Sequence, residues 1–488
     1  MIKVYNFFAL VLFFSLIVHC TSMVNNCMCQ WQPDVRLTNA SDSSLTPYNN
    51  ARGIASNGNL VHIVWNDKRD GNMEIYYKRS SDGGINWGTD IRLTNDSAIS
   101  IRPSVSVSGQ FVHVVWMDTR DGYYKIYYKC STDGGTNWAI DKRLSTAPFA
   151  SSYPSVSVAG QLVLVVWQDF RDGNPEIFCK YSTDGGIEWG NDILVTPSYS
   201  SQPSVFISSQ NVNVVWNDTR GGKTEIYYIS SSDGGINWGT ESRLTNHTTG
   251  FASYPNVAAS GQFVNVVWQD TRDGNYEIYY NCSTDGGINW AADMRLTNNS
   301  GTSFQPSLAV SGLDIHVVFN DNRDGNNEIY YKHSSNNGIN WDADTRLTNN
   351  SLYSIYPSIS ISGTTLNIIW SDNRDGNYEI YYKRNPTGNV GIHNINSGIP
   401  NKFDLSQNYP NPFNPKTKID FEFPLDGRIT LKVYDITGHE IAVLLNNEFK
   451  TANYYTIDFD GSNLASGIYF YRLQSENFMN VKRMVLIK

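Results

Sequence analysis

A short motif of acidic and basic residues recurs through most of the chain. Its first copy is Asp67-Lys68-Arg69-Asp70-Gly71-Asn72-Met73-Glu74, and later copies carry their arginine at Arg120, Arg171, Arg220, Arg272, Arg323 and Arg374. Oxygen ligands this close together suit calcium, but the spacing is not that of a known calcium loop and an arginine stands among them. An Asp-Gly hairpin with a local arginine–carboxylate bond explains the motif better. We therefore expect no metal and no other cofactor, with a calcium loop as the alternative.

The repetition of this motif also bears on catalysis. An active site needs one asymmetric set of groups, whereas these arginines and aspartates recur in near-identical copies. We therefore interpret them as architecture and assign no catalytic residue.

The positions most informative about binding are those where the copies differ while facing the same place. A proline opens one strand of most copies, at Pro103, Pro154, Pro203, Pro255, Pro306 and Pro357. The residues before these prolines are Arg102, Tyr153, Gln202, Tyr254, Gln305 and Tyr356, and the first copy, which we align without the proline, places Arg52 there. Around a ring they would crowd the mouth of a central channel, where arginine binds carboxylates and tyrosine stacks on sugars. The alternative is that they plug the channel and bond each other.

The elements that must position these residues are short strands repeated with a period of about fifty residues, a length that suits a four-stranded propeller blade. The second strand of each repeat recurs at residues 61–65, 112–116, 163–167, 212–216, 264–268, 315–319 and 366–370. Turn signals separate four short strands in each copy, and no helical periodicity intervenes. We predict an all-β chain with a seven-bladed β-propeller at residues 31–384, and six blades is the alternative.

The two ends of this repeat region complement each other. The seventh repeat lacks a fourth strand after Tyr382, whereas an unassigned strand at residues 34–38 precedes the first complete repeat. An unpaired sheet edge is a liability, and pairing these two segments removes it. We predict that the N-terminal strand closes the ring.

A second turn motif joins the third and fourth strands, first as Ser80-Ser81-Asp82-Gly83-Gly84-Ile85-Asn86-Trp87. It resembles the Asp box, also called the BNR repeat, of sialidase-like propellers. The aspartate accepts N–H bonds of its own turn, glycine supplies a positive φ, and tryptophan packs between sheets, so the role is structural. The paired positions are Asp82 and Trp87, Asp133 and Trp138, Asp184 and Trp189, Asp233 and Trp238, Asp285 and Trp290, and Asn336 and Trp341. The resemblance implies that glycans bind on the face away from these turns.

The N-terminus reads as an export signal. Lys3 is followed by an apolar run from Phe7 to Val18 and then by polar residues, which predicts a cleavable signal peptide at residues 1–22. Cys20 leaves a lipoprotein signal as the alternative. The net charge of −9, without a lysine and arginine run, argues against nucleic acid as a partner.

The composition changes after the repeats. Residues 385–401 read as a linker, and alternating strands in residues 402–488 predict a small Ig-like β-sandwich. The segments Asn408 to Pro415, Val433 to Gly438 and Leu464 to Tyr469 resemble the type A sorting domain of type IX secretion. That resemblance implies contact with the type IX machinery, passage through the periplasm and across the outer membrane, and release or attachment at the cell surface. An Ig-like module with another role is the alternative.

Two functions fit these observations. The first is a secreted or surface-bound, monomeric propeller without catalytic activity that binds a glycan or a surface protein. The second is an exo-glycosidase similar to sialidases, for which the resemblance implies an arginine cluster, a tyrosine nucleophile and an acidic acid/base. We favour binding because we find no unique carboxylate beside a unique tyrosine and no long loop insertions to wall a pocket.

Overall fold

The computed structural model describes residues 31–47, 52–197, 199–387, 403–408, 411–451, 453–475 and 478–488. The predicted signal peptide and most of the predicted linker lie outside these ranges. The described residues form β-strands and no helix, in agreement with the predicted all-β class. Within them, no helix is long and apolar enough to cross a membrane. The chain divides into two compact units.

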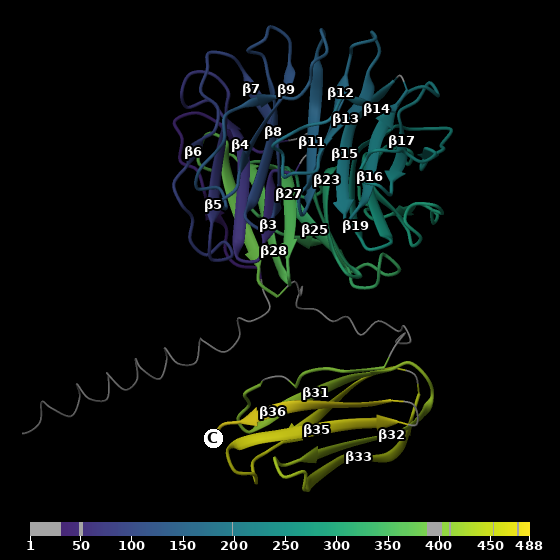
Figure 1. The fold of residues 1–488 in the computed structure, drawn as a ribbon. Coiled ribbons are helices and arrows are strands. Elements are labelled where there is room, and N and C mark those ends of the chain that lie inside the picture. Colours follow the sequence, from purple (N-terminus) through teal and green to yellow (C-terminus); the bar gives the residue numbers. More distant parts are fainter. Residues whose placement is uncertain are drawn as a thin grey trace, which may run out of the picture. The chain divides into compact units, whose positions relative to one another are not determined.

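The first unit is built from repeated antiparallel sheets (Figure 1). Five of them run from inner to outer strand in chain order. Their strands are β7 (Ser100–Ser108), β8 (Phe111–Asp118), β9 (Lys125–Ser131) and β10 (Lys142–Arg143); β11 (Ser151–Ala159), β12 (Leu162–Asp169), β13 (Glu176–Ser182) and β14 (Ile193–Thr196); β15 (Ser200–Ser208), β16 (Asn211–Asp218), β17 (Glu225–Ser231) and β18 (Ser242–Arg243); β19 (Ala252–Ser260), β20 (Phe263–Asp270), β21 (Glu277–Ser283) and β22 (Met294–Arg295); β23 (Ser303–Ser311), β24 (Asp314–Asp321), β25 (Glu328–Ser334) and β26 (Thr345–Arg346).

Two further sheets join the ends of this unit. In one, β27 (Ser354–Ser362), β28 (Thr365–Asp372) and β29 (Glu379–Asn385) are completed by β1 (Val35–Arg36), which pairs with Tyr381 and Tyr382 of β29. The other contains β4 (Leu60–Asp67), β5 (Glu74–Ser80) and β6 (Ile91–Arg92). Its inner strand consists of two short strands, β2 (Ser44–Leu45) and β3 (Ile54–Asn57), which both pair with β4. The pairing of β1 with β29 is the one that the sequence predicts.

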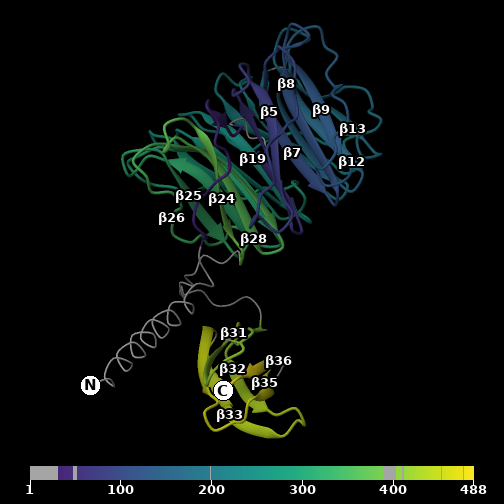
Figure 2. The ribbon, with the colours of Figure 1, turned by 90° about the vertical axis from the view of Figure 1, so that its left-hand side faces the viewer.

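Neighbouring sheets of this unit stand side by side (Figures 1 and 2). The inner strands contact each other in the cyclic order β3, β7, β11, β15, β19, β23 and β27, and β27 contacts β3 again. A cavity of about 220 Å³ at the centre is lined by residues of all these strands.

The core of this unit lies between neighbouring sheets. The second strands are buried on both faces and carry a fully buried aromatic residue two positions before their end, which is a tryptophan such as Trp65 or Trp116 in all of them except β24, where it is Phe319. One cluster joins Val64 and Tyr77 of one sheet to Val105 and Trp116 of the next. Burial on both faces explains why most residues of these strands are apolar on both sides of the sheet.

The second unit contains two antiparallel sheets. One orders β30 (Asp404–Leu405), β31 (Lys416–Phe423) and β34 (Asn453–Asp460), and the other orders β33 (Glu440–Lys450), β32 (Gly427–Tyr434), β35 (Gly467–Ser475) and β36 (Met479–Leu486). Both sheets contribute to one core, with Phe421 and Phe459 from the first and Leu431 and Tyr471 from the second.

Candidate functional site

The strand register assigns the turns of the first unit to two opposite faces. Asp118, at the end of β8, pairs with Ser100 at the start of β7, so the β8–β9 hairpin lies beside the beginning of the inner strand. The N–H of Gly134 donates to the carbonyl of Gln110, so the Asp-box turn lies beside the β7–β8 turn. The Asp-Arg hairpins and the starts of the inner strands therefore share one face, which we call the mouth face. The turns that resemble Asp boxes lie on the other, which we call the Asp-box face.

The Asp-Arg hairpins form closed local networks. Asp67 Oδ1 accepts hydrogen bonds from the backbone N–H (3.0 Å) and Nε (2.9 Å) of Arg69, and Oδ2 accepts from Trp65 Nε1 (2.9 Å) and Ser44 Oγ (2.7 Å). Burial alone would raise the pKa of Asp67, but hydrogen bonds from Arg69 and Trp65 lower it. Arg69 also bonds Asp90 (2.6 Å). The predicted arginine–carboxylate bond is thus confirmed, and both of its partners are occupied within the sheet that carries them.

The turns that resemble Asp boxes are organised locally as well. Asp82 Oδ1 accepts from Ser80 Oγ (2.7 Å) and from the backbone N–H groups of Ile85 (3.1 Å) and Asn86 (2.8 Å). The tryptophan of five of these turns packs edge-on against a tyrosine of the preceding sheet, as Trp138 does on Tyr77 at 4.8 Å between ring centroids, whereas Trp238 packs against the apolar cluster that contains Cys179. These contacts account for the motif as a turn.

The predicted mouth residues share an unusual backbone conformation. The register slips between Ile101 and Ser104, and the same slip recurs in the other sheets that carry the proline. The residue before each proline has a left-handed φ: Arg102 (56°), Tyr153 (53°), Gln202 (53°), Tyr254 (55°), Gln305 (53°) and Tyr356 (56°). These side chains are all half-buried. The prolines thus mark a β-bulge that the chain repeats at the mouth face.

Some of these residues meet and others bond to their own sheet. The Arg102 guanidinium lies 4.1 Å from the ring centroid of Tyr153. Gln202 accepts a hydrogen bond from Asn217 (2.6 Å), and Gln305 accepts one from Asn320 (2.7 Å). The structure therefore brings Arg102 and Tyr153 together, whereas the two glutamines are oriented by strand partners.

The register corrects the prediction for Arg52. Ser44 pairs with Asp67 as Ser100 pairs with Asp118, so Thr46-Pro47 takes the place of Arg102-Pro103 in the first repeat. The first repeat therefore has the proline, and residues 48–52 are an insertion after it. The insertion shifted the sequence alignment, and for this reason the placement of Arg52 before an inner strand like Arg102 was wrong.

Arg52 instead reaches into the central cavity. Its Nη2 donates to the carbonyl of Val257 on β19 (3.0 Å), and its guanidinium lies 4.6 Å from the ring centroid of Phe206 on β15. Burial lowers the pKa of Arg52 to about 10, so it remains cationic at neutral pH. For this residue the geometry matches the channel-plugging alternative.

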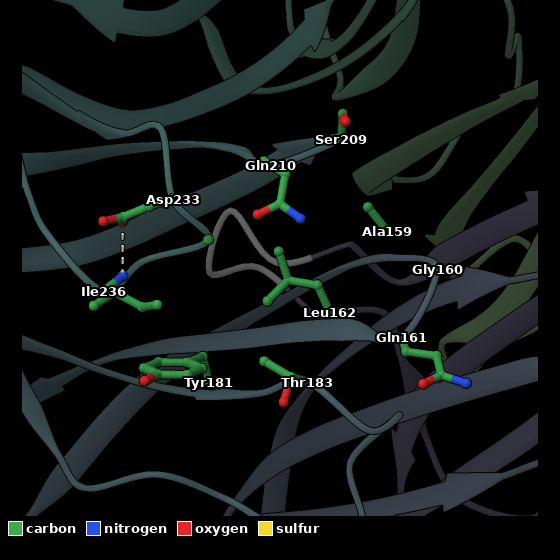
Figure 3. Close-up of a pocket in the computed structure, with 11 residues that line it drawn as sticks. Ala159, Gly160, Gln161, Leu162, Tyr181, Thr183, Ser209, Gln210, Asp233 and Ile236 are labelled. Carbon is green, nitrogen blue, oxygen red and sulfur yellow. Dashed lines mark hydrogen bonds between the residues drawn. The ribbon is translucent and has the colours of Figure 1, made fainter.

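A second cavity, of about 520 Å³, lies on the Asp-box face between the sheets that contain β13 and β17 (Figure 3). The sequence pattern did not predict this cavity. The available signal was local: Tyr181 and Ser209, which line it, stand where the other repeats have different residue types.

Comparison with known families identifies the end of the chain. Residues 407–488 match the model of the secretion system C-terminal sorting domain. The second unit carries a sorting domain. This domain indicates export by type IX secretion and a location at the cell surface or outside the cell.

Comparison with solved structures bears on the fold. The polysaccharide lyase Uly1 is 9% identical, with a TM-score of 0.51 over 73% of this chain and 100% of that one. An ulvan lyase of family PL25, bound to -[GlcA(1-4)Rha3S]-, is 9% identical, with a TM-score of 0.52 over 71% and 95% of the two chains. A mutant of a Trypanosoma rangeli sialidase that displays trans-sialidase activity is 10% identical, with a TM-score of 0.42 over 94% of this chain and 90% of that one. No curated protein matches in sequence. At this identity the two lyases show the fold alone, and with the repeated four-stranded sheets they support a β-propeller.

Proposed function

We propose that this chain is an exported, monomeric binding protein without catalytic activity: a seven-bladed Asp-box propeller, closed by β1, followed by an Ig-like sorting domain. Its ligand is a glycan that bears a carboxylate, and it binds at the mouth face. The sorting domain supports delivery of this propeller to the cell surface or the medium.

The observation that carries this proposal is the repeated bulge with different side chains. For a residue other than glycine, a left-handed backbone conformation is unfavourable by on the order of 1 kcal/mol. Glycine would avoid that cost, yet the six bulges hold one arginine, three tyrosines and two glutamines. A constant backbone that presents varied, costly side chains around one opening is what a binding surface requires.

The side chains define the class of ligand. A guanidinium binds a carboxylate through paired N–H groups, and Tyr153 beside Arg102 supplies a flat face for a sugar ring. Gln202 and Gln305 add amide groups at the same level of the ring. The oligosaccharide held by the similar ulvan lyase contains glucuronate, which makes uronate oligosaccharides the natural first probe.

The test measures binding of uronate, sialylated and neutral oligosaccharides to the purified full chain. We expect Arg102→Ala to weaken binding of the acidic sugars about tenfold or more, because a charge-assisted pair is lost. Lys68→Ala, which removes an exposed cation from the mouth face, serves as the matched control and should bind as wild type does.

Three outcomes would contradict the proposal. They are an absence of acidic-sugar binding, an Arg102→Ala variant that binds normally, and turnover of a fluorogenic sialoside that Arg102→Ala abolishes. The last would favour a sialidase-like exo-glycosidase instead.

A further inference from the structure

The cavity on the Asp-box face is formed by two adjacent repeats that differ from the others. Figure 3 shows Tyr181 and Thr183 on one side of Leu162, and Ser209 and Gln210 on the other. The cavity of about 520 Å³ falls within the range of small-ligand sites.

Tyr181 lines the space between these two sheets. In the first repeat the equivalent residue is Arg79, which crosses to the next sheet and donates to the carbonyl of Gly134 at 2.6 Å. Tyr181 makes no such bridge: its ring packs against the apolar cluster between the two sheets, and its Cε1 and Cζ lie 3.8 Å from the point where a Cβ on Gly190 would stand. The crevice that an arginine bridges in one repeat is therefore left as a cavity in another.

Ser209 adds a second departure at the rim. The equivalent turn position is glycine with a left-handed φ in the other repeats, at Gly58, Gly109, Gly160, Gly261, Gly312 and Gly363. Here a serine adopts a φ of 62°, a conformation that glycine adopts without strain. The substitution places a hydroxyl at the cavity, at an energetic cost that the turn itself does not require.

The polar side chains of the cavity have hydrogen-bonding capacity to spare. Among the residues that the structure describes, the side chains of Gln161, Tyr181, Thr183, Ser209 and Gln210 form no hydrogen bond to the protein. Two amides and three hydroxyls, beside a tyrosine ring and the apolar Leu162, match a sugar ring, which has hydroxyl edges and a C–H face.

The charge of the cavity selects among sugars. Its lining includes no cationic side chain and one carboxylate, Asp233. Hydrogen bonds from Asn237 and Ser231 lower the pKa of Asp233 to about 2, so the group stays ionised and is engaged in its own turn. The negative charge of this carboxylate repels carboxylated and sulfated sugars, whereas a neutral sugar experiences no such repulsion.

We propose that this cavity is a second binding site, which takes a neutral sugar residue of a glycan. It is distinct from the mouth face in position, in charge and in the ligand that it accepts. It does not rest on the proposed function, because the mouth face can fail as an acidic-sugar site while this one binds.

The test is a binding measurement on the full chain with neutral cello-, xylo-, manno- and laminari-oligosaccharides, alongside uronate oligosaccharides. We expect a neutral sugar to bind. Tyr181→Arg, which copies the first repeat and closes the crevice, should weaken binding about tenfold or more, as should Gln210→Ala. Gln262→Ala alters the equivalent turn of another repeat and is the matched control, expected to bind as wild type.

The site is overturned if no neutral sugar binds, if both cavity variants bind as wild type, or if Gln262→Ala loses as much affinity as Gln210→Ala. Should Tyr181→Arg fail to fold, Gln210→Ala decides alone. Arg102→Ala must leave neutral-sugar binding unchanged, which separates failure of this site from failure of the mouth face.

Discussion

Single charged side chains of the propeller are mostly committed to the sheet that carries them. Glu74 is fully buried and accepts from Arg92 (2.7 Å) and from Thr94. Similar sets recur around Glu277 and Glu328. Buried carboxylates are tolerated only when they are paired and hydrogen-bonded. This requirement explains why the set of a glutamate with its arginine and threonine partners repeats with so little change.

His333 is the exception among the buried histidines. Burial alone would lower its pKa, but hydrogen bonds and negative charge from Asp314 and Asp342 raise it to about 9. Its stacked neighbour His316 has no carboxylate in hydrogen-bond range among the described residues, and burial lowers the pKa of His316 to about 3. Only one member of this pair therefore carries charge at neutral pH.

This charge predicts a loss of stability at alkaline pH. Because the pKa of His333 is higher in the folded state than its ordinary value of about 6.5, its contribution is complete below that pH and is lost as pH rises through about 9. Thermal unfolding of wild type should shift to lower temperature between pH 6.5 and 9.5, taken as approximate limits of that window. The shift should be smaller in His333→Gln. Equal shifts in both proteins would show that His333 does not carry the effect.

At the scale of elements, the N-terminal segment replaces more than a strand. Trp31 packs edge-on against Tyr331 at 5.0 Å, as Trp87 does against Tyr382 at 4.9 Å. Asp34 bonds Arg374 (2.8 Å) and Lys383 (2.9 Å). Asp90 holds the equivalent arginine and lysine of the first repeat in the same way. The segment therefore supplies the tryptophan and the carboxylate that the seventh repeat lacks.

This replacement predicts a measurable destabilisation. Trp31→Ala should lower the free energy of unfolding by about 2 kcal/mol, because a half-buried aromatic contact between sheets is lost. Deletion of residues 31–39 should cost more, because β29 also loses its strand partner. Chemical denaturation provides the measurement, and the exposed Gln32→Ala provides the control. Unchanged unfolding of the deletion variant would contradict closure by this segment.

The two compact units of the molecule have separate hydrophobic cores. The first has its own cores between sheets, and the second has a single core shared by its two sheets. Each unit thus buries its own apolar side chains, as independently folding domains do.

This division predicts the effect of removing the sorting domain. A chain that ends at residue 387 should fold and melt as the full chain does in its propeller transition, but accumulate in the periplasm. Fractionation of cells and medium, with circular dichroism of the purified protein, would check both parts. Normal delivery of the shortened chain to the surface or medium would contradict the role of residues 407–488 in export.

The features of this protein that could be predicted from the sequence are those that depend on residues close together in the chain. Strand periodicity, the Asp-Arg hairpins and the turns around Asp82 follow from residues a few positions apart, and an unpaired strand at each end predicts the pairing of β1 with β29. The sorting domain could also be recognised from the sequence, because each of its motifs is a continuous stretch of residues.

The contacts between side chains of different sheets could be identified from the tertiary structure and not from the sequence. Arg102 on Tyr153, Arg52 on Val257 and Trp31 on Tyr331 join residues far apart in sequence, and the geometry of the ring sets these contacts. The insertion at residues 48–52 hid Pro47 from a sequence alignment, whereas hydrogen-bond register is insensitive to it. The cavity beside Tyr181 has the same origin, since it exists because two neighbouring sheets fail to fill the space between them.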